Sequence, residues 1–155
     1  MDEFEKALKV AGAYVGARML TCKELYDRLI RKKFDKNIAE KVVTEYVAAG
    51  ILDDREYARL YVSEGVRLSG KGMYRIKQEL FKKGIAASII DDVVKESEED
   101  TYEALFEYVE SHRLLDNITS RKELEKVQAR LLRRGFSLWE IKKCVEEFNV
   151  SFEEE

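Results

Sequence analysis

The sequence predicts an all-α protein that forms an elongated array of three tandem three-helix repeats, each similar to a helix-turn-helix unit. Three observations lead to this prediction. The 155 residues include no proline, and helix-forming residue types dominate the composition. Capping residues precede several of the apolar runs. Apolar and charged residues also recur with a fixed period, which is typical of stacked structural repeats.

The period is 51 residues, and it links core positions as well as charged ones. From it we expect repeats over residues 1–51, 52–98 and 99–155, the last with an acidic tail. A period longer than that of most helical-pair repeats favours three helices per unit. The recurring sets are Leu25, Ile76 and Val127; Leu29, Leu80 and Leu131; Phe34, Ile85 and Phe136; and the basic pairs Arg31–Lys32, Lys82–Lys83 and Arg133–Arg134.

The first repeat begins with a helix expected over residues 3–19. Thr21 follows as an N-cap, and Glu24, three residues later, completes a capping box that opens the second helix. The third helix is expected to start after Asp35 and to stop at Gly50, because glycine favours helix ends.

Capping residues mark the helix starts of the later repeats as well. In the second repeat, Asp53 and Glu56 form the expected box, and Gly84 ends the basic helix that follows. In the third repeat the corresponding boxes are Ser120 with Glu123 and Ser137 with Glu140.

The net charge of −3 hides an asymmetry along the chain. Residues 1–90 carry 18 basic and 13 acidic side chains, whereas residues 91–155 carry 10 and 18. An acidic balance argues against indiscriminate nucleic-acid binding, but a local basic face still suits a specific anionic partner. The strongest such stretch runs from residue 67 to residue 83, with six basic side chains and one acid.

From this charge pattern we predict a basic binding face. Its alternative is that these side chains only solvate helix faces, which is the better expectation for any single lysine or arginine. The predicted face comprises Arg31, Lys32, Arg67, Lys71, Arg75, Lys77, Lys82, Lys83, Arg133 and Arg134.

The sequence does not support an enzyme, and we expect no catalytic residue, cofactor or metal site. His112 has no second histidine nearby, and Cys22 and Cys144 lack metal-ligand spacing. The turn Ser69-Gly70-Lys71-Gly72 lacks the spacing of a phosphate-binding loop. No apolar run reaches 18 residues and the N-terminus is charged, so we expect a cytoplasmic protein with reduced cysteines; a disulfide is the alternative.

Three stretches together resemble the RecX family of regulatory proteins. They are Ile51-Leu52-Asp53-Asp54-Arg55-Glu56-Tyr57-Ala58, Gly72-Met73-Tyr74-Arg75-Ile76-Lys77-Gln78-Glu79-Leu80-Phe81-Lys82-Lys83-Gly84-Ile85, and Leu131-Leu132-Arg133-Arg134-Gly135-Phe136. The resemblance implies an all-helical modulator of the RecA recombinase, active in DNA repair, recombination and the SOS response. It implies binding within the groove of the RecA–DNA filament, and inhibition of strand exchange, ATP hydrolysis and coprotease activity. We expect a monomer that contacts single- or double-stranded DNA through its basic patches.

Two alternatives remain open at this level: a conventional helix-turn-helix DNA-binding protein and a structural adaptor. A recognition helix should carry arginine, asparagine or glutamine toward base edges. The third helices instead present a mixed charged set, and the basic residues stand at the ends of the second helices, which suits phosphate or acidic-protein contact. Three tyrosines, Tyr57, Tyr61 and Tyr74, could stack on bases if exposed, although Tyr57 and Tyr61 have the spacing of a packed helix face.

Overall fold

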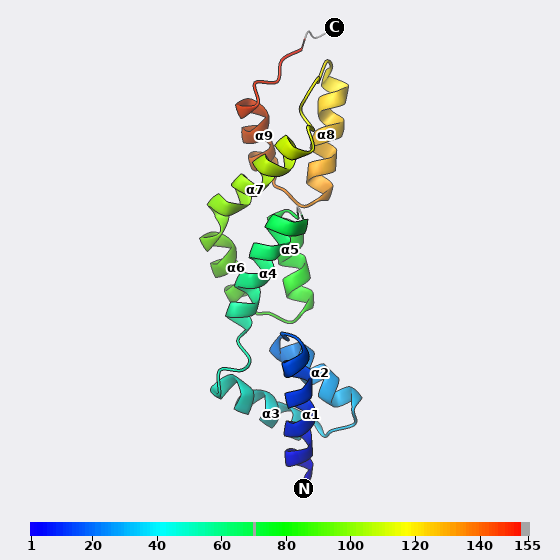
Figure 1. Ribbon diagram of the computed structural model, residues 1–155, viewed down its shortest axis with the longest axis vertical. Helices are drawn as coiled ribbons and strands as arrows, with labels where there is room; N and C mark the ends of the chain where they lie inside the picture. Colours follow the sequence, from blue (N-terminus) through cyan, green and yellow to red (C-terminus); the bar gives the residue numbers. More distant parts are fainter. Residues whose placement is uncertain (70, 153–155) are drawn as a thin grey trace. The chain divides into compact units, whose positions relative to one another are not determined.

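The computed structural model describes the backbone of residues 1–69 and 71–152, and their side chains except those of residues 67–69. Within these residues it contains nine α-helices and no strand, which confirms the all-α prediction (Figure 1). The helices are α1 (Glu3–Ala17), α2 (Cys22–Arg31), α3 (Lys36–Ala48), α4 (Asp54–Ser69), α5 (Met73–Lys82), α6 (Ala87–Glu96), α7 (Glu98–Ser111), α8 (Arg121–Arg133) and α9 (Leu138–Glu147).

The chain forms two compact units. Unit 1 comprises residues 1–60 and 80–91, and unit 2 comprises residues 61–79 and 92–155. Helices α4, α5 and α6 each contribute residues to both units. The division of the chain into three repeats with the expected boundaries stays a prediction.

The expected helix caps are present at most positions. Thr21 and Glu24 form the complete capping box at the start of α2, and Ser137 and Glu140 form it at the start of α9. Asp35 caps α3 through the backbone N–H of Asn37 at 2.8 Å. The Oδ1 atom of Asp53 likewise accepts from the N–H of Glu56 at 3.1 Å.

The start of α8 departs from the expected box. Ser120 caps α8 by accepting from the N–H of Glu123, but the Glu123 carboxylate accepts from Thr119, one residue before the cap. Helix α8 also begins three residues earlier than the 51-residue period would place it, counted from the starts of α2 and α5. Helix α8 is therefore almost one helical turn longer than α2 and α5.

The 51-residue period is visible in the backbone where the second helices end. Lys33, Gly84 and Gly135 all have positive φ, at 73°, 87° and 97°. One residue later, the N–H groups of Phe34, Ile85 and Phe136 donate to the carbonyls of Leu29, Leu80 and Leu131 at 3.2, 3.3 and 3.2 Å. This is the hydrogen bond of a Schellman motif. The same helix ending thus occurs three times.

The cores follow the recurring apolar residues. In unit 1, α1, α2 and α3 pack together around Leu25, Leu29 and Val42, which are fully buried. In unit 2, the cluster around Leu131 and Phe136 draws on α7, α8 and α9. The three recurring leucines, Leu29, Leu80 and Leu131, all have 0% exposure, which confirms that the period marks buried positions.

We predict that Leu131→Ala lowers the free energy of unfolding by about 2–5 kcal/mol, because it removes a fully buried side chain and leaves a cavity. The neighbouring Leu132 is 46% exposed, so Leu132→Ala is the matched control and should cost less than about 1 kcal/mol. Urea denaturation followed by circular dichroism measures both. Equal losses from the two variants would contradict the assignment of the recurring leucine to the core.

Candidate interaction surface and helix-end junctions

In unit 1 the end of α2 presents the first recurring basic pair. Arg31 and Lys32 are both exposed. Together with Tyr14 and Arg28 they line a hollow of about 360 Å³, in which the Arg28 guanidinium lies 5.0 Å from the centre of the Tyr14 ring. Three cations around one hollow create a positive local potential suited to an anionic group.

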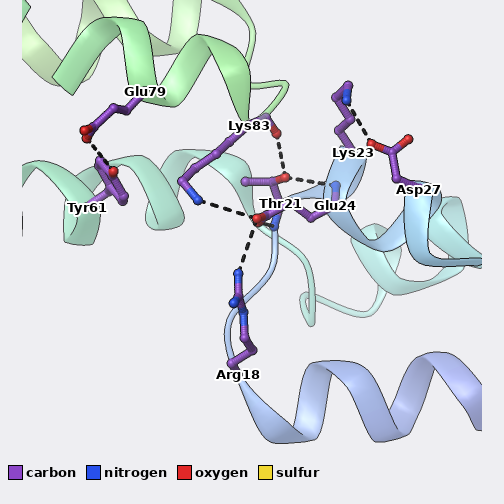
Figure 2. A network of polar contacts seen from close by, with 8 residues as sticks. All are labelled: Arg18, Thr21, Lys23, Glu24, Asp27, Tyr61, Glu79 and Lys83. Carbon is purple, nitrogen blue, oxygen red and sulfur yellow. Dashed lines mark hydrogen bonds and ion pairs between the residues drawn. The ribbon is translucent and has the colours of Figure 1, made fainter. Parts of the chain in front are cut away.

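The second recurring pair lies near the opposite end of α2. The hydroxyl of Thr21, the N-cap of α2, donates to the backbone carbonyl of Lys83 at 2.7 Å (Figure 2). The Nζ atom of Lys83 lies 3.5 Å from Oε2 of Glu24, which also pairs with Arg18 at 3.3 Å. Because α2 has ten residues, its length separates the two pairs by about 15 Å. Within unit 1 the basic groups are therefore spaced apart.

Unit 2 contains a matching junction between helix ends. The N–H of Gly72 donates to the carbonyl of Arg134 at 2.7 Å, and the N–H of Tyr74 donates to the carbonyl of Gly135 at 3.1 Å. These bonds satisfy donors at the start of α5 and acceptors at the end of α8, which helices leave unpaired. Both junctions join a C-cap carbonyl to the residue just before a helix. Lys83 is joined to Thr21 before α2, and Arg134 is joined to Gly72 before α5. Each pair of equivalent residues is 51 apart.

The junction in unit 2 requires two glycines in close approach. A Cβ atom on Gly72 would lie 2.0 Å from the carbonyl carbon of Gly135, and one on Gly135 would lie 2.6 Å from Cβ of Arg75. Gly135 also has positive φ, which glycine adopts without strain. The sequence did not predict this contact, because the pattern around Gly72 indicates only a basic turn.

The second cation of the two later basic pairs has a packing partner. The Lys83 ammonium lies 5.9 Å from the centre of the Tyr57 ring, and the Arg134 guanidinium lies 4.5 Å from that of Tyr108. Tyr57 and Tyr108 are themselves 51 residues apart, so the cation–π pair recurs as a unit. Lys83 and Arg134 therefore have a packing reason to recur, which the prediction of a basic binding face did not include. The spacing of the two tyrosines was the signal that could have revealed it.

Glu79, the acid within the basic stretch, contacts Tyr61, Lys71 and Arg75. The Glu79 carboxylate accepts from the Tyr61 hydroxyl (Figure 2) and from Lys71, whose Nζ is 2.9 Å away, and Nε of Arg75 lies 3.4 Å from it. Burial alone would raise the pKa of Glu79. The hydrogen bonds from Tyr61 and Lys71 and the charges of Lys71 and Arg75 outweigh burial and lower that pKa. Two cations of the predicted binding face are thus engaged within the protein.

The remaining predicted residues differ in exposure. Lys82 and Arg133 are exposed, as are Arg31 and Lys32, whereas Lys77 is half-buried. The side chain of Arg67 lies outside the described residues, as does Gly70 of the basic turn. Whether all ten residues share one face stays a prediction.

The other candidate reactive side chains are those of His112, Cys22 and Cys144. His112 is the C-cap of α7, and its Nδ1 atom lies 3.0 Å from the carbonyl of Tyr108. Both cysteines are free thiols. Burial and the nearby Asp54 raise the pKa of Cys22 to about 12, and burial and Glu147 raise that of Cys144 to about 11. Both thiols are therefore protonated, and weak nucleophiles, at neutral pH.

The described residues contain neither a metal-binding cluster nor a membrane-spanning helix. No group of three or more histidine, cysteine, aspartate or glutamate side chains is arranged to hold a metal ion there. None of the helices in that part of the chain combines the length and the apolar character needed to cross a membrane.

Comparisons with a family model and with known proteins point to one family. The family model described as RecX, second three-helix domain, matches residues 53–94. The regulatory protein RecX of Clostridium acetobutylicum is 32% identical over 154 residues, which cover 94% of this chain and 70% of that protein. The regulatory protein RecX of Chlorobium phaeobacteroides is 28% identical and matches over 92% of this chain and 93% of its own length.

A solved structure supports the fold as well. The crystal structure of RecX from Lactobacillus salivarius superposes with a TM-score of 0.84 at 25% identity, and the match covers 97% of this chain and 99% of that one. Some relatives are longer. The chain spans 56% of the Bacillus licheniformis protein and 49% of a Lactobacillus delbrueckii one.

The close approach at the unit 2 junction predicts that Gly72→Ala destabilises the protein by about 1–3 kcal/mol or more, since backbone atoms of Gly135 would have to shift. Gly16→Ala in α1 is the matched control, because a Cβ atom there would meet nothing within 4 Å. The control should be neutral or stabilising by up to about 1 kcal/mol. Thermal and urea denaturation measure both changes. A neutral Gly72→Ala variant would rule out the tight junction.

The lowered pKa of Glu79 predicts a pH-dependent contribution to stability. Because the folded-state pKa lies below the unfolded value of about 4.3, the contribution is fully present above that pH and is lost as the pH falls through the folded value. Glu79→Gln should therefore cost about 1–2 kcal/mol at pH 7 and progressively less in acid.

Glu40→Gln, on the exposed face of α3, is the control and should change stability little at any pH. Urea denaturation of both variants and the wild type between pH 2 and about pH 7, bracketing the ordinary glutamate value, measures the effect. A Glu79→Gln deficit that stays constant over this range would contradict the proposed charge network.

Proposed function

This chain belongs to the RecX family of regulatory proteins, and on that premise we propose that it regulates the RecA recombinase by binding the RecA–DNA filament. The observation that supports this most strongly is the similarity to proteins named regulatory protein RecX over more than nine-tenths of the chain. We propose that the effect is inhibitory and extends to ATP hydrolysis, strand exchange and coprotease activity. The protein would act in the cytoplasm as a monomer, by binding rather than by catalysis.

The proposed contact uses the basic side chains at the ends of the second helices. Arg31, Lys32, Lys82 and Arg133 are exposed and recur at equivalent positions of a 51-residue period. A helix-length interval between such groups suits a polyanion with regularly repeated charges, such as the phosphates along a nucleoprotein filament. Lys71, Arg75, Lys83 and Arg134 have partners inside the protein and would mainly hold the helix ends in place.

Recognition of base edges by the third helices has less support. The exposed residues of α6 include Asp91 and Asp92, which would meet the phosphates of a DNA groove with like charge. The filament-binding proposal therefore explains the charge distribution better than a conventional helix-turn-helix mode does.

The function is tested by measuring RecA-dependent ATP hydrolysis and strand exchange on single-stranded DNA with and without the protein. We expect both activities to fall in its presence. Absence of any effect at a several-fold excess over RecA would refute the proposed regulation.

The contact surface is tested by reversing the charge of the four exposed recurring residues: Arg31→Glu, Lys32→Glu, Lys82→Glu and Arg133→Glu. The log of the binding constant should fall with log salt by roughly 0.7–0.9 per phosphate neutralised. Because this variant neutralises fewer phosphates, it should bind filaments more weakly and with a flatter salt dependence. Anisotropy of labelled DNA within RecA filaments, measured over a range of salt, reports both quantities.

A control variant with the same change in net charge reverses Lys9, Lys36, Lys95 and Lys122, which are exposed but outside the recurring helix ends. It should lose some affinity through long-range repulsion and keep most of the salt dependence. Equal affinities and slopes for the two variants would show that the recurring ends are ordinary solvated surface.

A further inference from the structure

Unit 2 contains a cavity of about 720 Å³ that the proposed function leaves unused. Side chains from the start of α5, from α7 and from α9 line it, among them Tyr74, Tyr102 and Trp139. Tyr74 is 66% exposed and Trp139 is 68% exposed, which is unusual for such large rings. Aromatic walls with this much free surface are typical of sites that bind another molecule.

The protein places a cation of its own in this aromatic site. The Lys143 ammonium lies 4.1 Å from the centre of the Tyr102 ring and 5.5 Å from that of Trp139. Both distances are within the range of cation–π attraction. The ring faces are therefore arranged to receive a positive charge, with Lys143 as an intramolecular occupant.

The other charged groups around the cavity favour a cationic guest. Glu98, Glu99 and Glu103 of α7 line it with exposed carboxylates, and Lys77 is the one further lysine in its lining besides Lys143. Three carboxylates around one hollow attract a positively charged guest.

We propose that this cavity binds an arginine-bearing basic segment of a partner protein. A guanidinium is planar, stacks on aromatic faces and donates several hydrogen bonds, so it matches the rings of Trp139 and Tyr74 and the α7 carboxylates together. A nucleic acid would also stack on the aromatic rings, but its phosphates would face three carboxylates. None of the four exposed residues of the proposed filament contact lines the cavity, so the site would add a protein contact of opposite charge to it.

Trp139 is the only tryptophan of the chain, so its fluorescence reports this cavity directly. The probe is the blocked peptide acetyl-Gly-Arg-Leu-Arg-Gly-amide, with acetyl-Gly-Glu-Leu-Glu-Gly-amide and oligothymidylate as comparisons. We expect a saturable change in Trp139 emission with the arginine peptide alone. The double variant Glu99→Gln/Glu103→Gln should weaken binding by roughly five-fold or more, while Glu40→Gln/Glu45→Gln on α3 should leave it unchanged.

Lys143→Ala distinguishes the two classes of guest. Removing the internal cation should strengthen binding of the arginine peptide by about two- to five-fold, the equivalent of one exposed cation–π contact. A site for nucleic acid would instead bind oligothymidylate, and would bind it more weakly in this variant. Denaturation of each variant checks that the fold is retained. No saturable response to the arginine peptide, or oligothymidylate binding that Lys143→Ala weakens, would overturn the proposal. Filament binding is measured separately, so either inference can fail without the other.

Discussion

Two helix-end junctions are the constraint on which the arrangement of the functional side chains depends. In unit 1, the C-cap carbonyl of α5 accepts a hydrogen bond from Thr21, just before α2. In unit 2, the C-cap carbonyl of α8 accepts one from Gly72, just before α5. A helix end leaves carbonyl groups unpaired, and each junction satisfies one of them: the donor is the Thr21 hydroxyl in unit 1 and the Gly72 N–H in unit 2. The backbone must turn sharply directly after the C-cap residue. Gly84 and Gly135 make this turn with positive φ.

This constraint divides the recurring basic residues into two roles. Lys83 and Arg134 are at the junctions, where their side chains lie over tyrosine rings of the preceding helix and, for Lys83, beside Glu24. The residue before each of them, Lys82 or Arg133, is exposed. One helix ending thus supplies both a cation that stabilises the fold and a cation available to a partner. A pattern of charge alone does not separate these roles, because both residues are basic in both repeats.

Much of the fold could be predicted from the sequence because it depends on local or periodic signals. Thr21 with Glu24 and Ser137 with Glu140 are three residues apart, and the buried leucines follow one fixed period. The contacts that were missed join residues with neither property. Gly72 meets Gly135 across 63 positions, and only the folded chain shows that a side chain at Gly72 would strike the backbone.

The candidate site could be predicted less well than the fold for a related reason. The engagement of Lys71 by Glu79 depends on side-chain geometry, and so does the aromatic cavity beside Trp139, where rings from three helices converge. Exposed aromatic residues carry no periodic signal. The acidity of the third repeat was visible in the sequence, but its placement around a hollow was not.

Amide hydrogen exchange at Gly72 tests whether helix-end hydrogen bonds couple α5 to α8. The N–H of Gly72 donates across the junction to Arg134, whereas that of Phe136 donates to Leu131 within the α8 ending. In a Leu131→Ala background both amides should exchange faster. Exchange should change little at Glu24, whose N–H is bonded to Thr21 in the other junction. Loss of protection at Phe136 with wild-type protection at Gly72 would show that the two helix ends are not coupled.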